Sequence, residues 1–181
     1  MSLIDTHCHI YYDKYNNDFD KIIDRAKQNN ISKLICVGVD MESSIQSVKL
    51  AEDYAIIYAS VGFHPHESKD TNKNYLNELE ELLSHNKVVA LGETGLDFYY
   101  NHSNEKTQIR VFKEQLEFAK SLNMPAIVHC RNSDEKLLIK CFLTATGRLE
   151  TVTLSPRFEI SYVKNIFGPT TSTFTSFTGV L

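Results

Sequence analysis

Short apolar runs alternate with longer amphipathic stretches over the first 140 residues of the chain. Five runs have the continuous apolar character of strands that are buried on both faces: Leu3–His9, Lys33–Gly38, Ala55–Gly62, Val88–Glu93 and Ala126–Cys130. The stretches between them carry apolar residues at helical spacing: Phe19–Gln28, Met41–Tyr54, Lys73–Ser84 and Glu105–Leu122. Strands and helices that alternate in this way indicate parallel βα units.

Two architectures accommodate such a series, a doubly wound open sheet and a parallel β/α barrel. No glycine-rich phosphate-binding motif of the GxGxxG or GxxxxGK[ST] kind follows any strand, so a nucleotide-binding open sheet loses its main support. We therefore expect an α/β fold, a parallel (β/α) barrel of the TIM type, with residues 1–181 as a single domain. The alternation deteriorates after about Leu138, and a complete barrel needs about 250 residues. The barrel is therefore expected to be incomplete at its C-terminal end.

Composition narrows the kind of partner. The net charge of −4 excludes a general basic field that would draw the chain onto nucleic acid, so any DNA contact must be local. The four cysteines include no CxxC pair and are expected to be buried free thiols of a reducing compartment. No apolar run approaches the roughly 20 residues of a membrane span, and the N-terminus does not read as a signal peptide. The expected location is the cytoplasm, with the nucleus as an alternative, and no protein partner is inferred.

The first strand carries the strongest chemical motif, Asp5-Thr6-His7-Cys8-His9. Side chains alternate along a strand, so Asp5, His7 and His9 project from one face. Two imidazoles spaced in this way can bind one metal ion, and a carboxylate behind them can fix the orientation of their rings. A chance alternation of two histidines is the competing interpretation. The position of the motif on the opening strand of a βα series favours metal binding.

Three later strand ends carry further candidates. Glu93 follows an apolar strand and could bridge two metals or cap the turn that Gly95 permits. His129 ends another strand with Arg131 just beyond it, which predicts either a metal ligand beside a phosphate-binding guanidinium or a core histidine beside a surface cation. His64, in the loop Gly62-Phe63-His64-Pro65-His66, is a candidate for substrate contact, together with His66.

The convergence of these residues is more informative than any one of them. The carboxyl ends of barrel strands meet at one pocket, and a set of histidines with a bridging carboxylate suits two divalent ions. Two other histidines are expected to be exposed to solvent, His85 at a helix end and His102 in a polar loop. The sequence therefore predicts a dinuclear hydrolase.

Four stretches of the chain resemble the TatD-type family of metal-dependent deoxyribonucleases. They are IDTHCHI near the start, SVGFHPHE at 60–67, ALGETGLDFYY at 90–100 and PAIVHCRNSDE at 125–135. The resemblance covers residues 3–138 and implies a TIM-type barrel that hydrolyses DNA phosphodiester bonds, often from an end. It also implies a role for each candidate, which is as follows: His7 and His9 hold one metal, Glu93 is the bridging catalytic carboxylate, His129 holds the second metal, His64 and Arg131 contact substrate, and Asp5 supports the ligands.

The later part of the chain departs from that family. The family's histidine in an HCFSG-like strand would fall at 151–156, where this chain reads TVTLSP, and its late aspartate is missing. The last six residues, SFTGVL, nevertheless resemble the family's seventh strand and lie at about the usual distance in sequence from His129. We therefore hypothesise that residues 139–175 reflect a shifted reading frame, and we expect the loss of both groups to impair the activity.

The ions implied by the resemblance are two divalent metals, Mg²⁺, Mn²⁺ or Zn²⁺, with DNA as the substrate. Fold alone does not decide the substrate of such a barrel. Two other functions therefore stay open at this point: a related metal-dependent hydrolase of a small amide or ester, and an inactive remnant that binds metal.

Overall fold

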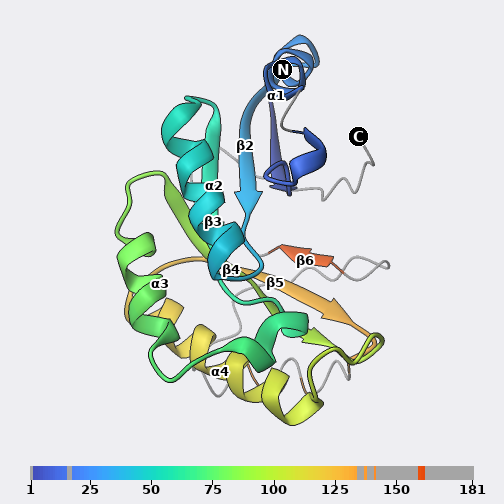
Figure 1. The fold of residues 1–181 in the computed structure, drawn as a ribbon, viewed down its shortest axis with the longest axis vertical. Helices are drawn as coiled ribbons and strands as arrows, with labels where there is room; N and C mark the ends of the chain where they lie inside the picture. Colours follow the sequence, from blue (N-terminus) through green and yellow to red (C-terminus); the bar gives the residue numbers. More distant parts are fainter. Residues whose placement is uncertain (1, 16–17, 134–136, 138–140, 142–158, 162–181) are drawn as a thin grey trace.

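Five parallel strands form a curled half-barrel (Figure 1). The computed structural model describes residues 2–15, 18–133, 137, 141 and 159–161. The strands follow one another across the sheet in chain order: β1 Leu3–Cys8, β2 Ile31–Val37, β3 Ile57–Val61, β4 Val88–Asp97 and β5 Ala126–Arg131. This order confirms the predicted α/β architecture. One difference is β6, Glu159–Ser161, which pairs with β5 in the antiparallel direction.

Helices connect the parallel strands where the apolar periodicity predicted them. They are α1 Phe19–Gln28, α2 Met41–Asp53, α3 Tyr75–Leu83 and α4 Glu105–Ser121, with two short 3-10 helices, η1 Asp13–Tyr15 and η2 Pro65–Asp70. At the start of α2, Asp40 accepts a hydrogen bond from the backbone N–H of Ser43, and the Ser43 hydroxyl accepts one from Asp40. This reciprocal cap satisfies backbone donors that no helical carbonyl reaches.

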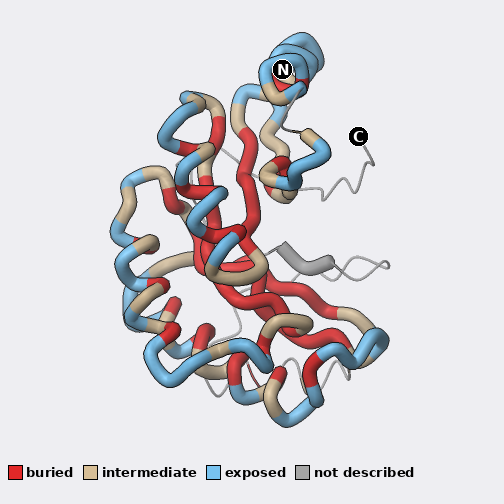
Figure 2. Tube along the Cα trace, in the orientation of Figure 1, coloured by how far each residue is buried: buried red, intermediate tan, exposed pale blue. Residues whose placement is uncertain are grey.

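Strands β3 to β5 and the second half of β2 are buried on both faces, as their continuous apolar runs predicted, whereas β1 is only partly buried (Figure 2). Along β2, Leu34 and Cys36 belong to the main core, to which the helices also contribute, while Ile35 and Val37 pack on the other face with Ile127 and Ala90. The alternation of side chains along β5 places His129 and Arg131 on the same face as Ile127. The second face of the sheet therefore leads toward the candidate site.

Two buried glutamines of α4 hold the backbone around this site. Gln115 accepts from Phe63 N and donates to Phe63 O and to the Thr94 hydroxyl, at 2.9, 3.0 and 2.7 Å. Gln108 accepts from Asp97 N at 2.8 Å and donates to Asp97 O at 2.9 Å. Because each buried amide has its partners, α4 fixes the end of β4 and the loop after β3 in position.

The length of β4 is the main correction to the predicted elements. The strand was predicted to end at Glu93, with a turn as one interpretation of the residues that follow, but it continues to Asp97. Gly95 has a φ of 145°, and a Cβ atom there would collide with the carbonyl oxygen of His129. A glycine in this position lets β4 and β5 approach closely.

Three further predictions concern the burial of the cysteines, membrane-spanning segments and residues 139–175. Cys36, Cys130 and Cys141 are buried and Cys8 is partly buried, and none of the four forms a disulfide. Among the described residues, no helix is long and apolar enough to cross a membrane. The frame hypothesis for residues 139–175 falls almost entirely outside the described part of the chain.

Candidate metal centre

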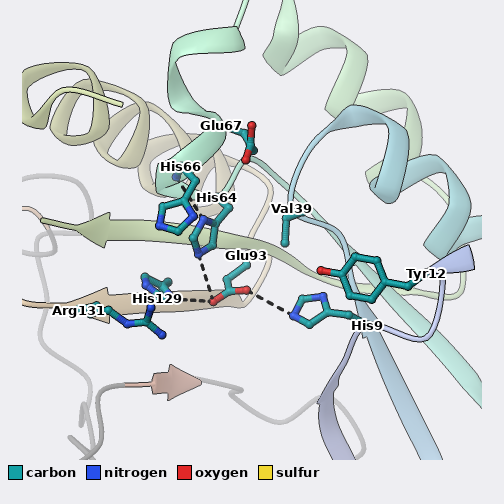
Figure 3. A pocket seen from close by; sticks show the side chains of 9 residues that line it. All are labelled: His9, Tyr12, Val39, His64, His66, Glu67, Glu93, His129 and Arg131. Atoms are coloured by element: carbon teal, nitrogen blue, oxygen red, sulfur yellow. Dashed lines mark hydrogen bonds and ion pairs between the residues drawn. The ribbon is translucent and has the colours of Figure 1, made fainter. Parts of the chain in front are cut away.

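A pocket of about 270 Å³ opens at the carboxyl ends of the parallel strands (Figure 3). Four strand or loop segments that are distant in sequence contribute imidazoles or carboxylates to it. The convergence that the sequence predicted is therefore present in the tertiary structure. The lining residues are His9, Tyr12, Val39, His64, His66, Glu67, Glu93, His129 and Arg131.

Glu93 lies at the centre of this arrangement and is 4% exposed. Its Oε2 atom faces His7 and His9, with Nε2 atoms at 3.4 and 3.8 Å. Its Oε1 atom faces the other side of the pocket, 3.0 Å from His129 Nδ1 and 3.9 Å from His64 Nε2. The two carboxylate oxygens thus take part in two separate groups of potential ligand atoms, His7-His9-Glu93 and His64-Glu93-His129.

The charge of Glu93 depends on its histidine neighbours. Burial alone would raise the pKa of this carboxyl, but hydrogen bonds from His129 and His7 and the charges around it hold the pKa well below its usual value. The group is therefore a carboxylate at neutral pH. An ionised carboxylate in a buried position requires positive partners.

His7 and His9 present their ring nitrogens to one point. The two Nε2 atoms lie 3.1 Å apart. Ligand atoms bound at about 2.0–2.1 Å to one ion lie roughly 3.0–3.4 Å apart, so this spacing fits a shared metal. The Nδ1 atom of His9 lies 2.8 Å from the Val37 carbonyl, which can only accept, so Nδ1 carries the proton and Nε2 keeps its lone pair. Burial lowers the pKa of His9, which favours the neutral form that binds metal.

His129 lies between two carboxylates. Its Nδ1 atom is 3.0 Å from Glu93 Oε1, and its Nε2 atom is 3.0 Å from Asp97 Oδ2. A carboxylate that accepts the proton of one ring nitrogen leaves the other nitrogen available to a metal. Nδ1 shares a proton with Glu93 in this arrangement and would release it on binding a metal, while Asp97 keeps the proton on Nε2, so Nδ1 is the ligand atom that this geometry favours.

Asp97 is the site residue that the sequence analysis missed. It is fully buried, and its Oδ2 atom also lies 2.9 Å from His66 Nε2. Burial by itself would raise its pKa, but hydrogen bonds from the Tyr100 backbone, His66 and His129 lower it. The sequence signal was the alternation Glu93, Gly95, Asp97, which would have been visible had the strand been extended beyond Glu93.

His64 differs from the other histidines in its tautomer. Its Nδ1 atom accepts from the backbone N–H of His66 at 3.1 Å, so the proton of the neutral ring is on Nε2, which points toward Glu93. Burial lowers the pKa of His64 to about 3, so the ring is neutral at pH 7. A protonated Nε2 is a hydrogen-bond donor, which agrees better with contact to substrate than with metal ligation.

The remaining predicted residues lie around this centre. Arg131 lines the pocket, with its side chain 40% exposed and Nη1 3.8 Å from Asp97 Oδ2. Asp5 accepts from the backbone N–H of His7 at 3.0 Å, whereas the Val37 carbonyl orients the ring of His9. Burial is the main cause of the raised pKa of Asp5.

The two histidines expected to be exposed behave differently. His102 is exposed but faces the rings of His66 and Tyr100. His85 is only partly exposed and lies 3.1 Å from Glu52, so that prediction was only partly right. His85 is not among the residues that line the pocket.

Comparisons with known proteins identify the family of the chain. The family model described as TatD related DNase matches residues 4–146. An uncharacterized metal-dependent hydrolase of Bacillus subtilis, YabD, is 36% identical over 136 residues, covering 75% of this chain and 53% of its own length. A protein of Shigella flexneri named as the 3'-5' ssDNA/RNA exonuclease TatD is 35% identical over 125 residues, covering 69% of this chain and 48% of its own length.

Solved structures share the fold. The crystal structure of YjjV, a TatD homologue from Escherichia coli, matches with a TM-score of 0.70 and 33% identity, covering 76% of this chain and 54% of that one. A TatD-family hydrolase of Entamoeba histolytica matches in fold with a TM-score of 0.73 and 24% identity, covering 81% of this chain and 55% of that one. The chain thus spans about half the length of the relatives that it matches.

Proposed function

The chain belongs to the TatD-related DNase family of metal-dependent hydrolases, and on that premise we propose that its pocket binds two divalent ions and hydrolyses DNA phosphodiester bonds from an end. The observation that carries the proposal is the central carboxylate of Glu93, whose two oxygens face different histidine groups. In this proposal His7, His9 and Glu93 would hold one ion. His129 and Glu93 would hold the other, so that Glu93 would be the bridging catalytic residue.

The donor set fits such ions. Imidazole nitrogen combined with carboxylate oxygen accommodates Zn²⁺ or Mn²⁺, and Mg²⁺ through the oxygens, with availability contributing to the choice. When bound, two such ions supply Lewis acidity toward a phosphoryl oxygen and lower the pKa of a water molecule. The side chains themselves arrive with suitable protonation: His9 has its Nε2 lone pair free, and Glu93 is ionised.

Arg131 and His64 would hold the phosphate of the substrate. A guanidinium offers paired donors that match phosphate oxygens, and Arg131 lies at the pocket mouth. The Nε2–H group of His64, which points toward Glu93, would donate a hydrogen bond to a phosphate oxygen of the substrate. Arg131 favours a phosphodiester over an amide, because an amide brings no negative charge for the guanidinium.

The test is hydrolysis of a single-stranded oligonucleotide labelled at its 5′ end. We expect shortening that requires Mn²⁺ or Mg²⁺, stops with EDTA, and is lost in Glu93→Gln. His85→Ala is the matched control, since it removes an imidazole outside the pocket.

The same assay separates the alternative functions. Turnover of a simple aryl ester without any shortening of DNA would replace the proposal by a small-ester hydrolase. No turnover of either, with Mn²⁺ still bound in calorimetry, would replace it by a metal-binding protein without catalysis.

A further inference from the structure

An exposed aromatic surface borders the pocket beside the ends of β4 and β5. Tyr99 and Tyr100 are 65% and 53% exposed, and their ring centroids lie 4.8 Å apart at an angle of 89°. The ring of His102 lies 5.8 Å from Tyr100 and nearly parallel to it, at 20°. Large aromatic side chains that lie together on the surface do not contribute to the core. Such groups of exposed side chains are typical of binding sites.

This aromatic surface is continuous with the proposed metal centre. The guanidinium carbon of Arg131 lies 5.2 Å from the Tyr100 ring centroid, a cation–π distance. The ring of His66 lies 5.7 Å from Tyr100 and 4.6 Å from His102. Arg131 and His66 both line the pocket (Figure 3), so these two side chains connect the aromatic surface to the proposed metal centre.

The backbone that carries these rings is held in place. The Oδ1 atom of Asp97 accepts from the backbone N–H groups of Tyr99 and Tyr100 at 3.0 and 3.2 Å. Ser103 donates to the carbonyl of His66 at 2.7 Å, and Gln108 donates to the carbonyl of Ser103 at 2.8 Å. The rings are thus presented by a fixed turn, so little ordering is needed when a ligand stacks on them.

We propose that Tyr100, with His102 nearly parallel beside it and Tyr99 at its edge, forms a stacking platform for a nucleobase adjoining the phosphate that Arg131 contacts, in a single-stranded nucleic acid. This inference rests on the proposed phosphodiester substrate. Aromatic side chains bind bases by their flat faces, with little preference for sequence. In a duplex interior those faces are covered by neighbouring bases, so the platform selects single strands and unpaired ends. The chain carries a net charge of −4 and so has no general positive field that would attract nucleic acid. Arg131 supplies a local positive charge beside the aromatic rings.

The test is equilibrium binding of a short single-stranded oligonucleotide that contains 2-aminopurine, whose emission changes on stacking. The full chain is titrated in EDTA, so that no hydrolysis occurs. We expect quenching with the natural chain and affinity at least about ten-fold weaker in Tyr100→Ala, as expected for a lost base–aromatic stack. Tyr100→Phe should keep the affinity within about two-fold, because the ring remains.

An abasic oligonucleotide supplies the decisive comparison. It should bind the natural chain as weakly as the base-containing strand binds Tyr100→Ala, and the tyrosine substitution should then have no further effect. Equal affinity for abasic and base-containing strands would overturn the platform. Ile45→Ala, at an exposed site on α2, is the control for loss of a surface side chain, and thermal unfolding checks that Tyr100→Ala is folded.

Failure of the platform and failure of the proposed function are separable. Metal-dependent hydrolysis with no base-dependent binding would overturn the platform and keep the nuclease. Base-dependent binding of single strands with no hydrolysis in Mn²⁺ would support the platform and overturn the nuclease.

Discussion

The two sides of the candidate metal centre are built differently. On the β1 side, the side chains of His7 and His9 are 14% and 26% exposed, and a backbone carbonyl of the neighbouring strand orients His9. On the β4–β5 side, the side chain of His129 is 5% exposed, and its ring lies between two carboxylates. The first side is open to solvent, and the second is fixed by a buried network.

This difference predicts different sensitivities. A ligand oriented by a backbone carbonyl keeps its orientation when neighbouring side chains change. A ligand oriented by Asp97 depends on a side chain, which is itself held by Gln108 of α4 through its backbone. The β4–β5 side should therefore respond more strongly to single substitutions.

Glu93→Gln should give the largest effect, because this residue contributes to both sides. We expect hydrolysis to fall by roughly 10²–10⁴-fold and Mn²⁺ binding to weaken at both sites in calorimetry. His85→Ala should match the unsubstituted chain in both measurements. Full activity in Glu93→Gln would remove this residue from the centre.

Gly95→Ala should break the close approach of β4 and β5. A Cβ atom would collide with the His129 carbonyl, at a backbone φ of 145° that alanine rarely adopts. We expect a loss of stability of roughly 2–3 kcal/mol, as for overpacked interiors, measured by urea unfolding. Ile45→Ala should change stability by less than about 0.5 kcal/mol. An unchanged unfolding midpoint for Gly95→Ala would contradict the packing described here.

Asp97→Asn should affect one side of the centre and spare the other. The neutral amide removes the charge that accepts from His129, so we expect metal affinity at the β4–β5 site to fall about 10–100-fold. The β1 site should keep its affinity. Two-site calorimetry with Mn²⁺ measures both constants, and equal weakening of the two sites would show that the sides are not independent.

Asp5→Asn should give the smallest effect. The amide oxygen still accepts the backbone hydrogen bond from His7, so we expect Mn²⁺ affinity to change by less than about three-fold, within the effect of a neutral hydrogen bond. The same calorimetry checks this value. A ten-fold weakening of the β1 site would instead support the ring-orienting role that the sequence suggested for Asp5.

Much of the fold was predictable because it depends on local patterns. α1 begins and ends at the predicted residues, and the other helices differ from their predicted bounds by at most two residues. Apolar periodicity carries this information along one segment at a time. β4 was predicted too short, since Gly95 resembles a turn residue when the neighbouring strand is unknown. In the structure Gly95 allows β5 to approach.

The residues of the candidate centre also fall into those that local sequence patterns predict and one that they do not. His7, His9, Glu93 and His129 could be predicted from sequence because they lie at or near the ends of apolar runs, and parallel strands bring such ends together. Asp97 was missed because its importance comes from contacts with His66 and His129, from two other segments of the chain.

The sequence by itself determined the alternating βα elements and the residue types at the strand ends, because these depend on periodicity along the chain. Only the tertiary structure decided which ring nitrogens face the pocket, which carboxylate oxygen faces which histidine pair, and that exposed tyrosines border Arg131. Those properties depend on hydrogen bonds and packing between distant segments. The Val37 carbonyl behind His9 illustrates the reason, since it belongs to the neighbouring strand and is invisible in the motif that contains His9.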